Sequence, residues 1–206
     1  MQLEAITLEA KKILERLKAF PEFYLAGGTA LALQVGHRVS VDFDLFSEKP
    51  FAANLLSRIE EEFKGFNIEI IENQSKQIDV TINGVNLSFI QYPFPIKYIK
   101  DKDLGINIAP IAEIAAMKAY AIGRRATLKD YIDLYFIIKD QFISLKNLIE
   151  LCEKKYGREF NARLLLGQLV YTKDIDMVDI TFLGDATTKE IIQSFFEKEI
   201  SGILEK

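Results

Sequence analysis

The chain is poor in the residues that build disulfides and soft-metal centres. It contains one cysteine, Cys152, and one histidine, His37, among 206 residues. A single cysteine cannot form an internal disulfide, and no Cys or His stands near it at metal-ligand spacing, so we interpret Cys152 as a core residue. His37 is expected at the end of a helix, beside Arg38, where it either contacts a substrate or has a structural role.

Long apolar runs are also lacking. No stretch approaches the roughly 18 apolar residues that a membrane-spanning helix needs, and the charged N-terminus MQLEAITLEAKKILERLKAF does not resemble a secretory signal. We therefore expect a soluble protein with no membrane partner and, by default, a cytoplasmic location. Hydrophobic residues make up 49% of the chain, enough for one large domain or two small ones.

The chain has no overall excess of positive charge. A net charge of −4 argues against a nucleic-acid binder that works through global basicity. Residues 118–163, however, contain ten Lys or Arg against six Asp or Glu, a balance of +4, so the rest of the chain sums to −8. An anionic ligand would be steered toward this stretch, although a solvated helical surface gives the same composition.

The first half of the sequence mixes strand and helix patterns. Asn83-Gly84 favours a tight type I′ turn between two alternating segments. A helix is expected over residues 50–66, with Pro50 near its start. β-branched or alternating segments predict strands at residues 22–26, 39–46, 66–72, 76–82 and 85–92.

The second half is helical in pattern. Apolar residues recur at three-to-four spacing over residues 111–125, 128–140, 144–157, 160–171 and 189–204. The segment PFPIKYIKDKDLGINIAP, residues 93–110, is the expected connection because it contains prolines and a glycine. The predicted fold is α+β, with a small mixed-sheet domain over 1–100 and a helical bundle domain over 101–206.

A glycine turn follows the first predicted strand. Gly27 and Gly28 permit backbone geometry barred to other residues, and Thr29 is a good N-cap for the helical segment ALALQVG. Strand, turn and helix N-terminus together form an anion site, where backbone N–H groups would point at a phosphate. The alternative is a turn that only connects two elements.

Two carboxylates stand in the next predicted strand, in VDFDLF. Asp42 and Asp44 would share one face while Val41, Phe43 and Leu45 point into the core. Two adjacent carboxylates repel each other unless a cation compensates them, and Mg²⁺ prefers hard oxygen ligands together with nucleotide phosphates. The alternative is an edge strand with a wet face bearing two ordinary aspartates.

Two stretches resemble a known family. GGTALALQVGHRVSVDFDLFS and, far downstream, KAYAIGRRATLKDYIDLY look like the AbiEii/AbiGii toxin branch of the DNA polymerase β-type nucleotidyltransferases. The resemblance implies a mixed-sheet nucleotidyltransferase domain and a helical domain, with a nucleoside triphosphate and Mg²⁺ between them. It assigns the triphosphate to Gly27, Gly28 and Thr29, and the metal to Asp42 and Asp44. It also makes Arg38 and Ser40 candidates for holding the metal-binding strand.

A third carboxylate is expected in two-metal enzymes of this type, on a strand beside the metal pair. VNLSFIQY offers Asn86 or Ser88 at that place rather than an acid. Three possibilities stay open. One metal suffices, Asp79 of the adjoining segment serves, or the site has lost its chemistry and only binds nucleotide.

The downstream motif supplies candidate phosphate contacts. Lys118 and Arg125 are seven residues apart and would share a face if the helix continues through Gly123. The resemblance supports a phosphate role for Lys118, and Arg125 and Lys129 extend the candidate nucleotide site. Asp130 and Asp133 share a helix face and could orient the basic residues by salt bridges, or could only fix the packing of two helices.

The sequence thus predicts a Mg²⁺-dependent nucleotidyltransferase of toxin type. Its expected partners are a nucleoside triphosphate, a tRNA or protein acceptor hydroxyl, and a cognate antitoxin. Asp42, Asp44 and Lys118 are the predicted catalytic residues, in a cleft that Gly28 also lines. The alternatives are a degenerate fold that binds nucleotide or an antitoxin without catalysis, and a structural protein in which the two aspartates are accidental.

Overall fold

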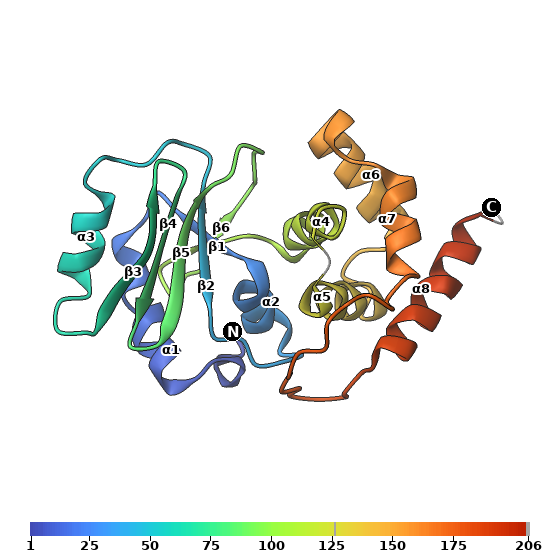
Figure 1. The fold of residues 1–206 in the computed structure, drawn as a ribbon, viewed down its shortest axis with the longest axis horizontal. Helices are drawn as coiled ribbons and strands as arrows, with labels where there is room; N and C mark the ends of the chain where they lie inside the picture. The colour runs from blue at the N-terminus through green and yellow to red at the C-terminus, as the bar shows by residue number, and fades with distance from the viewer. Residues whose placement is uncertain (126, 205–206) are drawn as a thin grey trace. The chain divides into compact units, whose positions relative to one another are not determined.

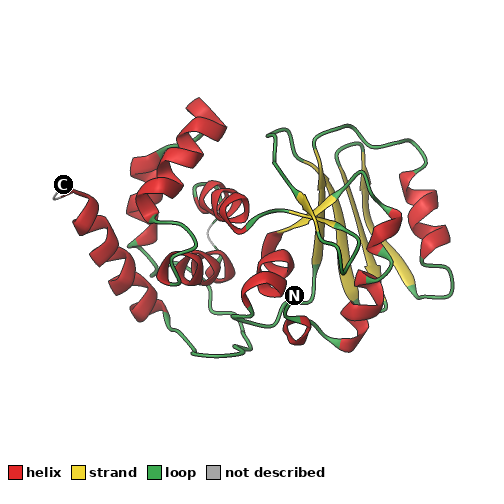
Figure 2. Cartoon of the chain, turned by 180° about the vertical axis from the view of Figure 1, so that it is seen from behind, coloured by secondary structure: helices red, strands yellow, loops and turns green. Residues whose placement is uncertain are grey.

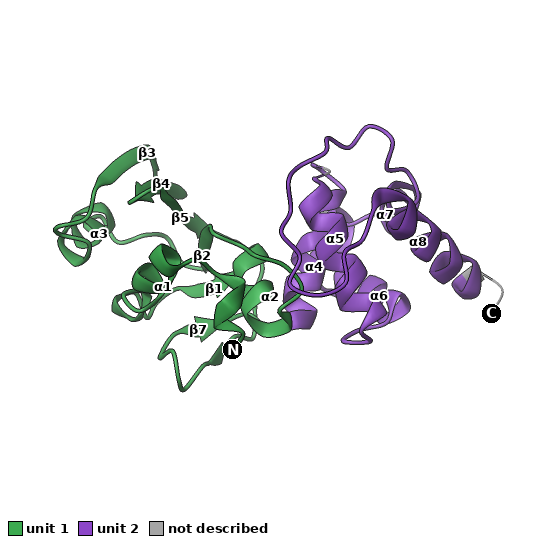
Figure 3. Cartoon of the chain, turned by 90° about the horizontal axis from the view of Figure 1, so that it is seen from below, with its two compact units in different colours: residues 1–110 green, residues 111–206 purple. Residues whose placement is uncertain are grey.

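The computed structural model describes residues 1–125 and 127–204, so Ala126, inside the downstream motif, lies outside the described part (Figure 1). The chain divides into two compact units, Met1–Pro110 and Ile111–Lys206 (Figure 3). The first unit contains a sheet with helices and the second is helical (Figure 2). The α+β class predicted from the sequence is confirmed. No helix in the described ranges is long and apolar enough to cross a membrane.

The first unit is built on a mixed sheet. Its seven strands lie in the order β3-β4-β5-β2-β1-β7-β6. Strands β2 and β5 pair in parallel, as do β1 and β7, while the other neighbours are antiparallel. The strands are β1 (Tyr24–Ala26), β2 (Phe43–Ser47), β3 (Ile68–Gln74), β4 (Gln77–Ile82), β5 (Val85–Gln91), β6 (Ile99–Lys100) and β7 (Asn107–Ile108).

Three α-helices accompany the sheet, namely α1 (Leu8–Leu14), α2 (Gly27–Val35) and α3 (Leu55–Glu62), with two short 3-10 turns at Leu3–Ala5 and Leu17–Ala19. Helices α1 and α3 lie on the same side of the sheet (Figure 3). That side forms the core, where Phe89 of β5 meets the rings of Phe20 and Phe23 at 5.1 and 5.0 Å between centroids. The sequence analysis did not predict α1.

The hairpin between β4 and β5 follows the predicted turn chemistry. Asn83 and Gly84 both have positive φ, 49° and 82°, as a type I′ turn requires. The predicted strand over 66–72 is displaced, because β3 begins at Ile68 and runs to Gln74. The segment expected to be a connection contributes β6 and β7 to the sheet edge.

Two predicted elements are shorter in the structure. The strand expected over 39–46 begins only at Phe43, because Ser40 donates its backbone N–H to Ala5 at 2.8 Å instead of joining a strand ladder. Val41 is accordingly 38% exposed, so its predicted place in the core is wrong. The helix expected over 50–66 spans Leu55–Glu62, after a turn in which Leu55 N–H bonds to Ala52, and the chain turns at Gly65 with φ +90°.

The second unit packs around one buried helix. Its helices are α4 (Ile111–Ile122), α5 (Leu128–Lys139), α6 (Leu145–Tyr156), α7 (Ala162–Leu169) and α8 (Lys189–Leu204), with a 3-10 turn at Gly157–Glu159. Nearly every residue of α5 is buried, from Asp130 to Ile138. Ser144 and Asn161 cap α6 and α7 by accepting backbone N–H groups with their side chains.

Candidate functional site

The glycine turn begins helix α2. Gly27 has φ +70°, a conformation that favours glycine, and it is the first residue of the helix. The predicted N-cap role of Thr29 is wrong, because the cap position is Ala26 and carries no side-chain hydrogen bond. The N–H groups of the first turn of a helix have no partner within the helix, so the turn still presents backbone donors to an anion.

Both glycines also make room for charged neighbours. A Cβ atom on Gly27 would collide with Oδ2 of Asp44, so the carboxylate lies directly against the helix start. A Cβ atom on Gly28 would stand 2.5 Å from Nη2 of Arg38, so the guanidinium lies directly against this glycine. Any larger residue at either position would displace one of these two charges.

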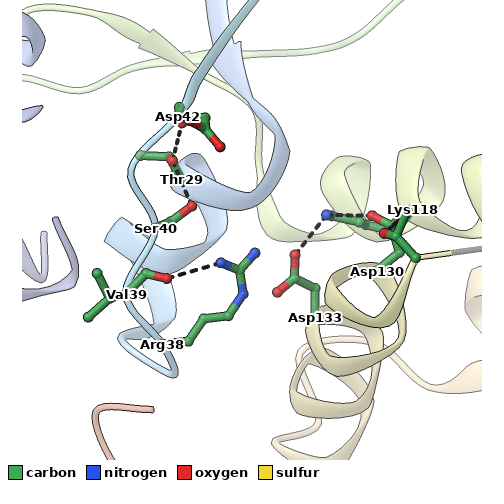
Figure 4. Close-up of polar contacts among 9 residues, drawn as sticks. Thr29, Arg38, Val39, Ser40, Asp42, Lys118, Asp130 and Asp133 are labelled. Atoms are coloured by element: carbon green, nitrogen blue, oxygen red, sulfur yellow. Dashed lines mark hydrogen bonds and ion pairs between the residues drawn. The ribbon is translucent and has the colours of Figure 1, made fainter. Parts of the chain in front are cut away.

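Thr29 ties the helix to the segment that leads into β2. Its hydroxyl donates to the backbone carbonyl of Asp42 and lies 2.8 Å from the hydroxyl of Ser40 (Figure 4). The side chain is buried. The hydroxyl predicted to hold a triphosphate thus positions the backbone of the first aspartate, and the Thr29 group that fits a phosphate is its N–H.

Asp42 and Asp44 are on the polar side of the sheet. Asp44 pairs with Ser88 of β5, and Asp42, just before β2, accepts a hydrogen bond from Nδ2 of Asn86 at 3.0 Å. Both aspartates are half-buried, whereas Phe43 and Leu45 between and after them are buried in the core. The predicted alternation therefore holds for these two apolar residues.

The position expected for a third acid holds an amide. Asn86 contacts Asp42 directly, and Ser88 stands between Asp44 and Asp79, since the register across β2, β5 and β4 is Asp44, Ser88, Asp79. Asp79 accepts a hydrogen bond from Gln77 at 2.7 Å. In residues 1–125 and 127–204, no three acidic, His or Cys side chains gather closely enough to hold a metal. Asp79 therefore does not complete the site.

Two carboxylates still fit a magnesium ion. Mg²⁺ is commonly held by one or two carboxylates, with nucleotide phosphates and water completing six oxygen ligands. The Asn86 amide occupies Oδ1 of Asp42 and orients the group, which leaves its second oxygen to face a cation. The oxygen donors of Asp42 and Asp44 are therefore compatible with a magnesium ion that takes its remaining ligands from other molecules.

In the second unit, Lys118 of α4 lies between two carboxylates of α5. Its Nζ is 2.7 Å from Oδ1 of Asp130 and 2.7 Å from Oδ2 of Asp133 (Figure 4). Lys118 is 9% exposed and Asp133 is fully buried. Burial by itself would lower the pKa of Lys118, but the charges of Asp133 and Asp130 outweigh it and raise that pKa above its ordinary value.

The other basic residues of the motif are placed differently from the prediction. Helix α4 ends at Ile122, so Lys118 and Arg125 do not share a face of one continuous helix. Arg125 and Lys129 are exposed. Arg124 lies over the ring of Tyr120, 3.5 Å from its centroid, and donates to the backbone carbonyl of Glu159. The sequence analysis missed this cluster, although Tyr120 and Arg124 have helical i, i+4 spacing.

The sequence analysis singled out three further residues, which are buried in the structure, namely His37, Arg38 and Cys152. His37 is buried and follows Gly36, the left-handed residue (φ +73°) that ends α2. Arg38 is buried and donates to the carbonyl of Val39 at 3.1 Å. Cys152 is a core residue as predicted, and burial raises the pKa of its thiol to about 12.

The fold is that of the nucleotidyltransferases. The chain aligns with MenT4, the nucleotidyltransferase toxin Rv2826c from Mycobacterium tuberculosis H37Rv, at a TM-score of 0.63 and 16% identity, covering 97% of this chain and 84% of that one. A putative nucleotidyltransferase from H. pylori aligns at a TM-score of 0.56 and 20% identity, over 98% and 99% of the two chains. Identities this low establish the fold alone.

Sequence comparison identifies the family within this fold. A family model described as nucleotidyl transferase AbiEii toxin, type IV TA system, matches residues 12–205. The chain is also 35% identical over 188 residues to Uncharacterized protein aq_aa25 of Aquifex aeolicus (strain VF5), covering 89% of each. The chain therefore belongs to the AbiEii nucleotidyltransferase toxin family, as the resemblance predicted.

Proposed function

We propose that this chain is a Mg²⁺-dependent nucleotidyltransferase toxin. It transfers a nucleoside monophosphate from a nucleoside triphosphate to a hydroxyl of RNA or protein and releases pyrophosphate. The supporting observation is the arrangement in the first unit, where the carboxylate of Asp44 lies against the glycine that starts α2 and Asp42 stands on the same side of the sheet. The proposed metal site and the proposed anion site would thus adjoin each other.

The chain's own groups have separate tasks in this proposal. The N–H groups of Gly28 and Thr29 receive phosphate oxygens at the positive end of α2. Asp42 and Asp44 hold the metal, with Asn86 fixing the orientation of Asp42. A bound Mg²⁺ supplies charge neutralisation at the phosphates and orients the triphosphate for in-line displacement.

The geometry of Lys118 is compatible with a phosphate contact in addition to its ion pairs with Asp130 and Asp133. An ammonium group has three N–H donors, and two are directed at Asp130 and Asp133, which leaves a third that neither aspartate takes. The two aspartates fix the position of Nζ and keep it protonated. In this proposal the third N–H of Lys118 serves as a phosphate donor, and Arg125 and Lys129, being exposed, supply long-range attraction for an anion.

The test is transfer of label from each of the four nucleoside triphosphates, labelled at the α-phosphate, to total tRNA or to cell protein in the presence of Mg²⁺. Asp42→Asn and Asp44→Asn should abolish transfer. Asp79→Asn is the matched control, because it removes a carboxylate from the same side of the same sheet, two strands from Asp44. Equal transfer by the wild type and the two metal-ligand variants would refute the assignment.

A second candidate function is nucleotide or antitoxin binding without catalysis. It is favoured by the amide of Asn86 at the place expected for a third acid. Under this alternative the wild type binds a triphosphate in a Mg²⁺-dependent manner but transfers no label, and Asn86→Asp confers transfer. Under the catalytic proposal the wild type transfers label, so the one experiment separates the two functions.

A further inference from the structure

An aromatic stack of Tyr120 and Tyr156, extended by the tilted ring of Phe160, lies in the second unit where α4 meets the 3-10 turn Gly157–Glu159. Tyr120 stacks on Tyr156 with centroids 4.3 Å apart and planes 27° apart, and Tyr156 lies 6.4 Å from the ring of Phe160. Arg124 covers the other end of the stack, 3.5 Å from the centroid of Tyr120.

The guanidinium of Arg124 is held in place on this stack. It donates to the backbone carbonyls of Tyr120 and Glu159 at 3.2 and 3.0 Å, and its Nη2 is 3.9 Å from a carboxylate oxygen of Glu159. The hydroxyl of Tyr120 donates to the same carboxylate at 2.7 Å. These contacts fix both the position and the plane of the guanidinium.

Arg124 nevertheless reaches solvent. Its side chain is 45% exposed although one face lies on a ring and both terminal nitrogens are bonded. Because one face of the guanidinium lies on the ring of Tyr120, a ligand that stacks on Arg124 would meet the opposite face. A flat, weakly hydrated cation of this kind stacks well on a nucleobase.

Exposed basic residues outnumber acidic ones in the segments around Arg124, where the exposed acids are Glu153 and Glu159. Arg125 follows it directly, and Arg158 precedes the Glu159 that holds it. Further exposed basic residues stand on the same two turns or on the adjoining helix ends, and the whole set is Arg124, Arg125, Lys129, Lys154, Arg158 and Arg163. The structural alternative is that these charges only complement the negative ends of α4 and α6, which explains basicity but not an exposed stacking plane.

We propose that this end of the helical unit is a docking surface for single-stranded RNA. An unpaired base stacks on the outer face of Arg124, and neighbouring phosphates contact Arg125 and Arg158. The inference rests on the proposed function, for which it names RNA as the acceptor class, and it is tested by binding without triphosphate or metal. A failure of transfer and a failure of docking are therefore measured separately.

The experiment measures the affinity of the full-length chain for labelled oligoadenylate and oligouridylate of roughly ten nucleotides across a salt series. Both probes have the same charge, but adenine stacks more strongly. The wild type should prefer oligoadenylate. Arg124→Lys keeps the positive charge but lacks the planar guanidinium. It should therefore bind oligoadenylate about tenfold more weakly and lose the preference for oligoadenylate over oligouridylate. The slope of its log affinity against log salt should stay that of the wild type.

Removal of the flanking charges should have the opposite signature. The double variant Arg125→Gln, Arg158→Gln should keep the adenine preference but flatten the slope of log affinity against log salt by about 1.4, since each phosphate contact to a single strand contributes about 0.7. Lys146→Gln, an exposed lysine at the far end of α6, is the matched control and should change neither quantity.

Two outcomes would overturn the proposal. One is unchanged binding of both probes by Arg124→Lys and by the double variant, which would place RNA elsewhere or exclude it. The other is an equal loss of affinity for both probes in Arg124→Lys together with a lowered Tm, which would show that Arg124 only holds the 3-10 turn to α4.

Discussion

The molecule contains two pairs of aspartates that differ in how their charge is balanced. In the first unit, Asp42 and Asp44 stand two residues apart at the start of a strand, half-buried, beside an amide and a glycine. In the second unit, Asp130 and Asp133 stand three apart on a helix, are buried, and share the ammonium of Lys118. The second pair has its cation built into the fold.

The two pairs therefore differ in burial, and in the second pair one ammonium group contacts both carboxylates. Buried carboxylates are costly unless a counter-charge offsets them, and Lys118 supplies such a charge to both members of the second pair. The first pair is partly solvated, which lowers the cost of its repulsion and leaves it open to a metal ion from solution. Substitutions in the first pair should therefore affect activity much more than stability, whereas substitutions in the second pair should affect stability in addition to any phosphate contact of Lys118.

The largest expected effect is on activity and concerns the first pair. Asp44→Asn should reduce nucleotide transfer on the order of a thousandfold, as expected for the loss of a group that acts on the transition state. Its Tm should change far less than its activity, because Asp44 is only half-buried and Asn has nearly the same shape as Asp. Transfer assays and thermal melts of the same preparation measure both. A large fall in the Tm of Asp44→Asn would show that the first pair also has a structural role, and would contradict the difference drawn here between the two pairs.

The second prediction concerns the buried pair. Lys118→Met should destabilise the protein by about 3–5 kcal/mol, because it removes the ammonium group that both buried carboxylates contact. Adding Asp130→Asn and Asp133→Asn to that variant should restore part of the loss. Urea unfolding measures the free energies, with the exposed Lys146→Met as the control. A loss below about 1 kcal/mol in Lys118→Met would mean that the pair does not depend on this lysine.

The third prediction concerns Thr29, whose hydroxyl holds the backbone of Asp42. Thr29→Val should cost about 1–2 kcal/mol, because the carbonyl of Asp42 loses a buried hydrogen bond. It should also raise the Mg²⁺ concentration needed for half-maximal transfer, since the backbone of one ligand is less well held. Thr29→Ser keeps the hydroxyl and should behave like the wild type. Equal metal requirements in all three proteins would contradict an anchoring role.

The smallest effect is on pH dependence. The raised pKa of Lys118 means that its contribution to stability is fully present below the unfolded pKa of about 10.4 and is lost as pH rises through the folded pKa. The wild type should therefore lose more stability above about pH 10.4 than Lys118→Met does. Unfolding free energies at neutral and alkaline pH measure this difference. Parallel pH profiles would show that Lys118 is not stabilised by its aspartates.

Local patterns predicted much of the fold. The Asn83-Gly84 turn, the alternation around Phe43 and Leu45 and the helical periodicity of the second half depend on residues close in sequence, and the structure contains each of them. Predictions failed where distant segments compete for the same groups. Residues 39–42 bond to Ala5 and Thr29 instead of extending β2, and the strands β6 and β7 form only because the edge of the sheet is available to them.

The candidate site shows the same division. The sequence by itself determined the residue types, namely a glycine pair, two aspartates at strand spacing, and a lysine followed by two aspartates at helix spacing, because such periods are properties of the backbone. Only the tertiary structure decided that Asn86 would meet Asp42, that the hydroxyl of Thr29 would turn inward, and that Lys118 would lie between its two aspartates. Those contacts depend on strand register and on helix packing, which arise from the burial of apolar surface across the whole unit and leave no short-range signature in the chain.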